Sequence, residues 1–157
     1  MMIGIVRGSS LTLYYQLATL CILILFALYD IRYHRVRNAA LICFLPWCLL
    51  SLLVQRYSTG LPDFFLLFRA FLGFLNGGLI LFTTALVTHG GIGGGDIKLT
   101  ALLGIICGSM GVCILLSAAA LGALLFLLLS SARTKKSGGR LPFVPFLLFG
   151  FLLLWLI

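Results

Sequence analysis

The chain has 157 residues, of which 62% are hydrophobic and only 9% are charged. Because a soluble domain carries roughly a quarter of charged residues, this composition excludes an ordinary soluble enzyme and indicates a membrane protein. It predicts one transmembrane domain over residues 1–157, without a separate soluble domain. The formal net charge is +8. We expect the basic residues to set membrane topology and to contact anionic lipid, rather than to bind nucleic acid.

Apolar segments long enough to cross a bilayer follow one another along the chain, since a spanning helix needs roughly 20 such residues. The first segment has no small-residue cleavage site after it, so we interpret it as an uncleaved helix rather than a signal peptide. After Asp96 the chain stays apolar until Ser131, which leaves room for two spans with a turn at residues 108–111. The sequence thus predicts an all-α bundle of six transmembrane helices. Their ranges are 11–29, 39–55, 63–87, two spans within 97–131, and 142–157.

The loops between these helices predict the orientation of the chain. Alternation places loops 30–38, 88–96 and 132–140 on one side of the membrane. The cations of that side are Arg32, Arg35, Arg37, Lys98, Arg133, Lys135, Lys136 and Arg140, against Arg7, Arg56 and Arg69 on the other. Since Lys and Arg concentrate in cytoplasmic loops, we expect the first side to be cytoplasmic and both termini to lie outside.

The acidic residues are only three, all Asp, and they divide between the two sides. Asp30 ends the first helix and Asp96 begins the fourth, so two crossings separate them and they meet at the same face. Asp63 starts a helix on the opposite face, where a solvated carboxylate is ordinary. From Asp96 to the turn the helix is roughly 18 Å long, against a hydrocarbon core of roughly 30 Å. We therefore expect Asp96 about 10 Å below the interface, with loop 88–95 forming a wet notch.

Two ionisable groups at membrane depth are candidates for a functional site. A close pair of carboxyls shares one proton, so one can take a proton from water while the other donates one to a carbonyl oxygen. This is aspartic protease chemistry, which needs neither a metal nor a cofactor. Two structural alternatives remain. Asp30 could cap its helix and pair with Arg32 or Arg35, and Asp96 could be the N-cap after a glycine turn.

Other interpretations of the glycine and cysteine content fail on spacing. No Gly-Lys pair forms a phosphate loop, the dinucleotide fingerprint starting at Gly91 has Asp96 at its last position, and the Asp comes one residue late for a calcium nonapeptide. The five cysteines form no C-x-x-C pair, so we expect apolar packing rather than zinc or disulfides.

Three motifs resemble those of the type IV prepilin peptidases, which are GxGD membrane aspartic proteases. "GGGDIKL" at 93–99 resembles their G-x-G-D-x-K-L motif, and "LPFVPFLLFG" at 141–150 resembles the Pro-Phe-x-Pro-Phe segment that opens the last helix. "DIRYHRVRN" at 30–38 resembles the first motif, an Asp, a basic stretch and Ile-Pro-Asn, with Arg37 in the place of Pro.

The resemblance implies a dyad of Asp30 and Asp96 that cleaves a basic leader from a prepilin-like membrane protein, at the cytoplasmic face of a prokaryotic plasma membrane. It implies a short form that cleaves without methylating the new N-terminus. The substrate-binding or supporting residues that it implies are Gly93, Gly94, Gly95, Lys98, Arg37 and Asn38. The glycines would let a substrate backbone approach closely. Arg37 is expected to loosen the turn after the first helix, and Lys98 either snorkels to the interface or contacts the substrate.

Two alternatives stay open. Tyr29-Asp30 together with G-x-G-D is similar to presenilin-like and signal-peptide-peptidase-like proteases, although the Pro-Ala-Leu motif of those longer proteins is missing. The chain could instead be a small transporter whose two Asp form a proton or ion site. The separation of the carboxyls distinguishes the two classes, because a water-activating dyad needs them close together.

Overall fold

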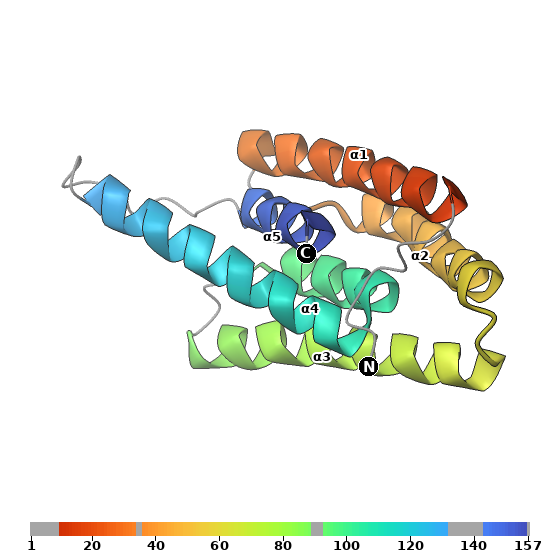
Figure 1. Cartoon of the computed structure of the whole chain (residues 1–157). Helices are drawn as coiled ribbons and strands as arrows, with labels where there is room; N and C mark the ends of the chain where they lie inside the picture. Colours follow the sequence, from red (N-terminus) through yellow and green to blue (C-terminus); the bar gives the residue numbers. More distant parts are fainter. Residues whose placement is uncertain (1–9, 34–35, 89–92, 132–142, 157) are drawn as a thin grey trace.

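The computed structural model describes residues 10–33, 36–88, 93–131 and 143–156, and within these ranges every regular element is a helix (Figure 1). The helices are α1 (Ser10–Tyr33), α2 (Asn38–Thr59), α3 (Asp63–Val87), α4 (Gly94–Ser131) and α5 (Val144–Leu156). The first four are long and apolar enough to cross a membrane, and α5 is a shorter apolar helix. The predicted all-α architecture is confirmed for the part that is described.

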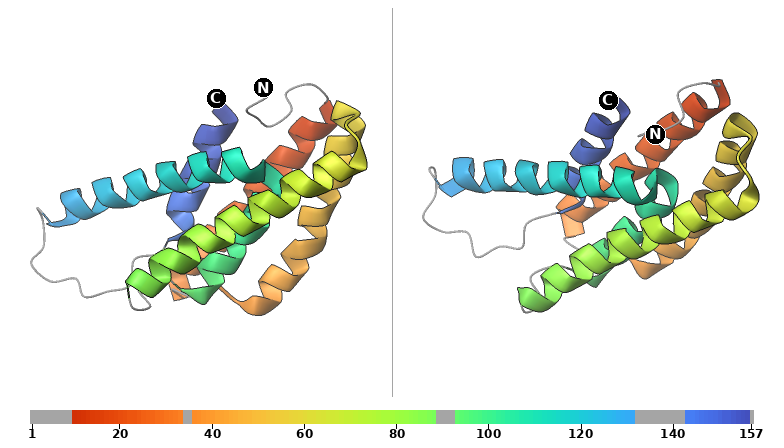
Figure 2. Two further views of the ribbon diagram at one scale, coloured as in Figure 1. Left: turned by 90° about the horizontal axis from the view of Figure 1, so that it is seen from below. Right: turned by 60° about the horizontal axis from the view of Figure 1, so that its bottom comes forward.

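The helix count differs from the predicted six, because α4 continues through the predicted turn. Only Gly108 leaves the helical conformation, with φ 73° and ψ 176°, so no loop separates the two halves of α4. Figure 2 shows the sharp change of direction between them. The turn therefore begins where the sequence predicts it, at the first residue of 108–111. Glycine is required there because other residues rarely adopt a positive φ.

Helix α4 is the centre of the bundle. About two-thirds (67%) of its most apolar stretch is buried, against 22–28% for the corresponding stretches of α1, α2 and α3. Its first half lies against α3 and its second half against α5 (Figure 2). The fully buried side chains of this core include Leu99, Leu103, Val112, Leu115, Leu147 and Phe151. The half of α4 that carries Asp96 is thus packed in the interior of the bundle.

Helices α3 and α4 touch through their backbones. A Cβ on Gly77 would lie 2.6 Å from the carbonyl oxygen of Thr100, and a Cβ on either Gly73 or Gly104 would overlap the backbone of the other. Small residues at such spacing let two membrane helices approach closely, since van der Waals contact rather than water exclusion drives their association. This contact fixes the first half of α4 on α3.

The break at Gly108 leaves helix carbonyls without intrahelical partners, and two polar side chains from other helices supply them. Gln55 of α2 donates through Nε2 to the Ile106 carbonyl at 3.2 Å. Arg69 of α3 donates through Nη2 to the Cys107 carbonyl at 3.3 Å and through Nη1 to Gln55 Oε1 at 3.0 Å. Backbone groups at this depth must bond within the protein. The half-buried Arg69 therefore caps an interrupted helix.

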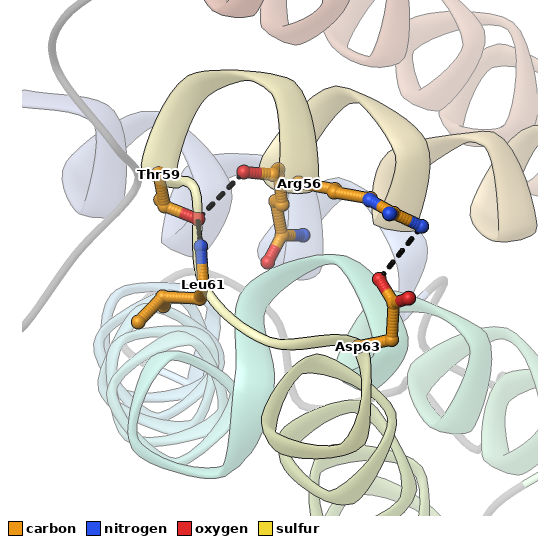
Figure 3. Close-up of polar contacts among 5 residues, drawn as sticks. Arg56, Thr59, Leu61 and Asp63 are labelled. Carbon is orange, nitrogen blue, oxygen red and sulfur yellow. Dashed lines mark hydrogen bonds and ion pairs between the residues drawn. The ribbon is translucent and has the colours of Figure 1, made fainter.

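Polar contacts between residues close in sequence stabilise the connection from α2 to α3 (Figure 3). The Thr59 hydroxyl donates to the Gln55 carbonyl at 2.7 Å and accepts from the Leu61 N–H at 3.3 Å. Arg56 forms an ion pair with Asp63 at 2.9 Å, and both side chains are exposed. The prediction that Asp63 is a solvated carboxylate at a helix start is confirmed.

Arg69→Gln and Arg56→Gln should differ in their effect on stability. We expect Arg69→Gln to lower the free energy of unfolding by about 1–3 kcal/mol, because the Cys107 carbonyl and Gln55 lose a charged donor. The exposed pair of Arg56 contributes about 0–1 kcal/mol, so Arg56→Gln should change little. Unfolding in mixed micelles, followed by circular dichroism, measures both. Equal losses in the two variants would contradict the capping role of Arg69.

Candidate active site

Asp30 lies in the last turn of α1 and is almost fully buried, with 3% of its surface exposed. The helix continues to Tyr33, four residues beyond the predicted range of 11–29. The Asp30 carboxylate oxygen Oδ2 accepts a hydrogen bond of 3.1 Å from the backbone N–H of Val144, at the start of α5. Asp30 is therefore oriented by a helix that follows it by more than a hundred positions.

The start of α5 explains why this bond forms. Pro145 has no N–H, and the N–H groups of Phe146 and Leu147 donate to the Phe143 carbonyl at 3.1 and 3.3 Å. Val144 then carries the one first-turn donor without a partner on α5. Asp30 takes the part that an N-cap side chain usually plays, from another helix.

Among the described residues, Asp30 does not form the ion pair with Arg32 that one alternative predicts. Arg32 is exposed, and its guanidinium carbon lies 5.9 Å from the centre of the Tyr33 ring. Arg35 lies outside the described residues, as do residues 89–92 of the predicted wet notch and the basic loop at 132–140. Within the described ranges the ion pair that forms is the one between Arg56 and Asp63.

Asp96 is the third residue of α4 and is half-buried. It is not the N-cap: the helix begins at Gly94, and the Gly93 carbonyl accepts from the N–H groups of Asp96 at 3.0 Å and Ile97 at 3.4 Å. The Asp96 carboxylate folds back over Gly93, where an added Cβ would lie 3.1 Å from Oδ2. A larger residue at position 93 would therefore push the carboxylate away. Gly94 is exposed, and a Cβ there would meet nothing within 4 Å.

The two carboxyls lie within electrostatic reach of each other. They come from α1 and α4, helices whose backbones do not pack directly together in the described ranges. Helices α2 and α5 each contact both α1 and α4, and so connect them. The structure thus brings together the two acids that the sequence places on one face.

The segment after α1 contacts the start of α4. A Cβ on Gly95 would lie 2.8 Å from Val36 Cβ and 3.0 Å from the Val36 carbonyl oxygen, so the two backbones touch because residue 95 is glycine. Lys98 donates through Nζ to Asn38 Oδ1 at 3.1 Å, and both side chains are exposed. These contacts join the first motif to the second beside the carboxyls.

Arg37 precedes α2 as its N-cap residue, so the chain does not continue α1 to this position. Its backbone has φ −72° and ψ 132°, and this φ is the one that a proline ring imposes. The expected loosening of the turn is therefore not seen at residue 37. The Arg37 side chain is exposed and carries no capping hydrogen bond.

Two apolar grooves of similar volume flank the site. The α2–α3 groove, of about 680 Å³, is lined by α2, α3 and the first half of α4, and it includes Asn38 and Lys98. The α1–α2 groove, of about 630 Å³, is lined by α1 and α2 and includes Tyr29 and Arg37. The α2–α3 groove thus reaches residues of both motifs, and the α1–α2 groove reaches the first motif only.

The sequence profile of the Type IV leader peptidase family matches residues 17–131, which is most of the chain and includes both Asp30 and Asp96. The chain belongs to this family. It is 34% identical over 157 residues to the prepilin leader peptidase/N-methyltransferase of Bacillus subtilis (strain 168). That similarity covers 98% of this chain but 59% of the relative, so the chain spans about three-fifths of the relative's length. No solved structure matches the chain. Membership in the type IV leader peptidase family confirms the resemblance seen in the three motifs.

Two contacts of this candidate site escape prediction from sequence. The N–H of Val144 is a backbone group, and the sequence marks it only through Pro145, which removes the next donor of the first turn. The contact of Val36 with Gly95 joins the segment after α1 to the start of α4, and the distance between these two segments depends on the whole bundle.

Gly95→Ala and Gly94→Ala form a matched pair in the same turn of α4. We expect Gly95→Ala to lower the free energy of unfolding by about 1–3 kcal/mol, because its methyl group would overlap Val36. Gly94→Ala adds a methyl group in open space and should leave stability unchanged or raise it by about 0.5–1 kcal/mol. Chemical unfolding in micelles compares the two. If both variants are as stable as the parent, Val36 and Gly95 are not in contact.

Proposed function

We propose that this protein is an aspartic endopeptidase of the membrane that removes the basic leader peptide from type IV prepilin-like proteins. The observation that carries the proposal is the pair of carboxyls of Asp30 and Asp96, which lie within electrostatic reach of each other at one end of an apolar helix bundle. Family membership supports it, and so does the relative named as a prepilin leader peptidase.

In this mechanism the two carboxyls act as a unit that holds one proton. The ionised carboxylate takes a proton from a water molecule as the water oxygen bonds to the scissile carbonyl carbon, and the protonated carboxyl donates to the carbonyl oxygen. The carbon–nitrogen bond then breaks as the leaving amine receives the proton taken from water, and a hydroxyl group of the intermediate returns its proton to the other carboxylate. The product acid and amine leave, and the dyad again holds one proton. The bond from Val144 to Asp30 Oδ2 would orient one carboxyl throughout these steps.

The active end faces the cytoplasm in this proposal. Among the described cations, Arg32, Arg37 and Lys98 lie at the end of the dyad, in or beside the segments that carry it, whereas Arg56 and Arg69 belong to the other end. The start of α1 and the end of α5 lie at the same end of the bundle, away from the start of α4 (Figure 2). This arrangement supports external termini in the plasma membrane of a prokaryote.

Lys98 is the proposed contact for an acidic side chain early in the mature part of the substrate. Its ammonium has three donors, and the bond that it makes to Asn38 goes to a neutral oxygen. A basic leader would be repelled by a basic face, so a carboxylate beyond the scissile bond would favour the correct register.

Asp30→Asn and Asp96→Asn should each lower leader removal by about 10²–10⁴-fold, because each variant loses a carboxyl that transfers protons. Co-expression with a type IV prepilin and separation of precursor from mature protein on a gel measures this loss. Asp63→Asn is the matched control, since Asp63 lies exposed in an ion pair at the other end of the bundle. If either Asp30→Asn or Asp96→Asn still removes the leader at the parent rate, the dyad proposal is wrong.

Lys98→Glu tests the proposed substrate contact. We expect kcat/KM for a prepilin with an acid near the start of its mature segment to fall about 10-fold, as for the loss of one charge-assisted bond. An Arg56→Glu variant should cleave normally. A second prepilin that lacks the acid serves as the comparison substrate. If the ratio of kcat/KM for the two prepilins is the same in Lys98→Glu as in the parent enzyme, the proposed contact is wrong.

A further inference from the structure

The α2–α3 groove is an apolar depression that no described helix covers. Its walls are large side chains from α2 and α3, among them Ile42, Leu79 and Phe82, and at least half of the surface of each of these three is exposed. The groove extends along α3 from Phe74 to Phe82, which is about 12 Å or roughly two helical turns.

The floor of this groove is built from small residues. Gly78 of α3 and Ala101 of α4 both line it, and a Cβ on Gly78 would lie 3.3 Å from the Ala101 Cβ. Large walls around a flat floor of this kind suit another helix, because small residues allow backbones to approach closely. A flexible acyl chain does not require small residues in the surface that it covers.

One end of the groove lies beside the segment that carries Asp96. Ile97 and Lys98, which directly follow Asp96, line this end together with Asn38. The first turn of a helix that lies here would point its unpaired N–H groups toward the polar end, where an acidic side chain of that turn could meet Lys98. A helix docked in the groove would thus begin beside the two carboxyls.

We propose that the α2–α3 groove docks the first two turns of the substrate's own transmembrane helix, with the scissile bond extending from the helix start toward Asp96. This inference rests on the proposed function and adds to it the surface that receives the mature segment. The occupant is a single apolar helix whose N-terminus faces the cytoplasm. Docking would position the cleavage site by depth, since the groove ends at the level of the dyad.

The α1–α2 groove is less suited to a helix although its volume is similar. Its lining contains the bulky rings of Phe26, Phe44 and Trp47. Its alanines, Ala39 and Ala40, lie in the first turn of α2, and none of its described lining residues is a glycine. It borders Tyr29 and Arg37 rather than the residues that follow Asp96. This groove therefore serves as the matched control surface.

Photocrosslinking distinguishes the two grooves. A benzophenone amino acid replaces Leu75 in the α2–α3 groove or Leu25 in the α1–α2 groove, both of which are exposed, in an Asp96→Asn chain that leaves the substrate uncut. With a type IV prepilin as the probe, we expect at least about five-fold more adduct from position 75 than from position 25. Equal adducts from the two positions, more adduct from position 25, or adducts with lipid or a second copy of this chain alone would overturn the docking site.

A second variant tests the same inference through kinetics. Leu79→Trp narrows the α2–α3 groove and should raise KM for the prepilin about five-fold with little change in kcat, because the added ring opposes docking rather than chemistry. Leu25→Trp should change neither constant. If the wild-type chain does not cleave the prepilin at all, the proposed function fails. If it cleaves but Leu79→Trp behaves like Leu25→Trp, only the docking site is wrong.

Discussion

The hydrogen bond from the Val144 N–H to the buried carboxylate of Asp30 determines how the active end of this bundle is arranged. In an apolar environment a buried acid and an unpaired backbone donor each cost free energy, and together they satisfy each other. Within the described ranges no buried side-chain nitrogen or oxygen lacks a partner. Because this bond joins α1 to α5, the orientation of Asp30 in the first motif depends on α5, the helix that begins within the third motif. The three motifs are thus one structural unit.

The other acid is held by contacts between backbones. Asp96 follows two glycines at the start of α4, and Gly95 lets this start touch Val36. Further along, Gly104 and Thr100 lie against the glycines of α3. The glycine content that first suggests a flexible loop therefore serves mainly for close approach, except at Gly60 and Gly108, where it permits a positive φ. Rigid placement by packing is what a site needs if it is to hold two acidic groups near each other.

Much of this architecture could be predicted from the sequence because the bilayer restricts it. Hydropathy gives the third helix its observed bounds of 63–87, glycine content marks the break at Gly108, and alternation of crossings puts Asp30 and Asp96 at one end. The end of α1 and the position of Asp96 in its helix were predicted less well. Apolar composition marks the membrane boundary rather than the end of a helix, and α1 continues beyond that boundary to Tyr33. The residue before α4 is Gly93, whose carbonyl accepts from the Asp96 N–H, so Asp96 lies in the first turn of the helix rather than before it. The partners of Arg69 depend on the bundle as a whole.

The single non-helical residue of α4 has a consequence for the distance between the two acids. On one side of Gly108, the segment that carries Asp96 is fixed to α3, and on the other side the chain packs on α5, which holds Asp30. Asp96 lies 12 residues from Gly108, so the intervening helix is a lever about 18 Å long. A rotation of about 10° at this pivot would shift the Asp96 carboxylate by about 3 Å without unwinding a helix. The dihedral angles of one glycine at the far end of the bundle thereby set the gap between the two carboxyls.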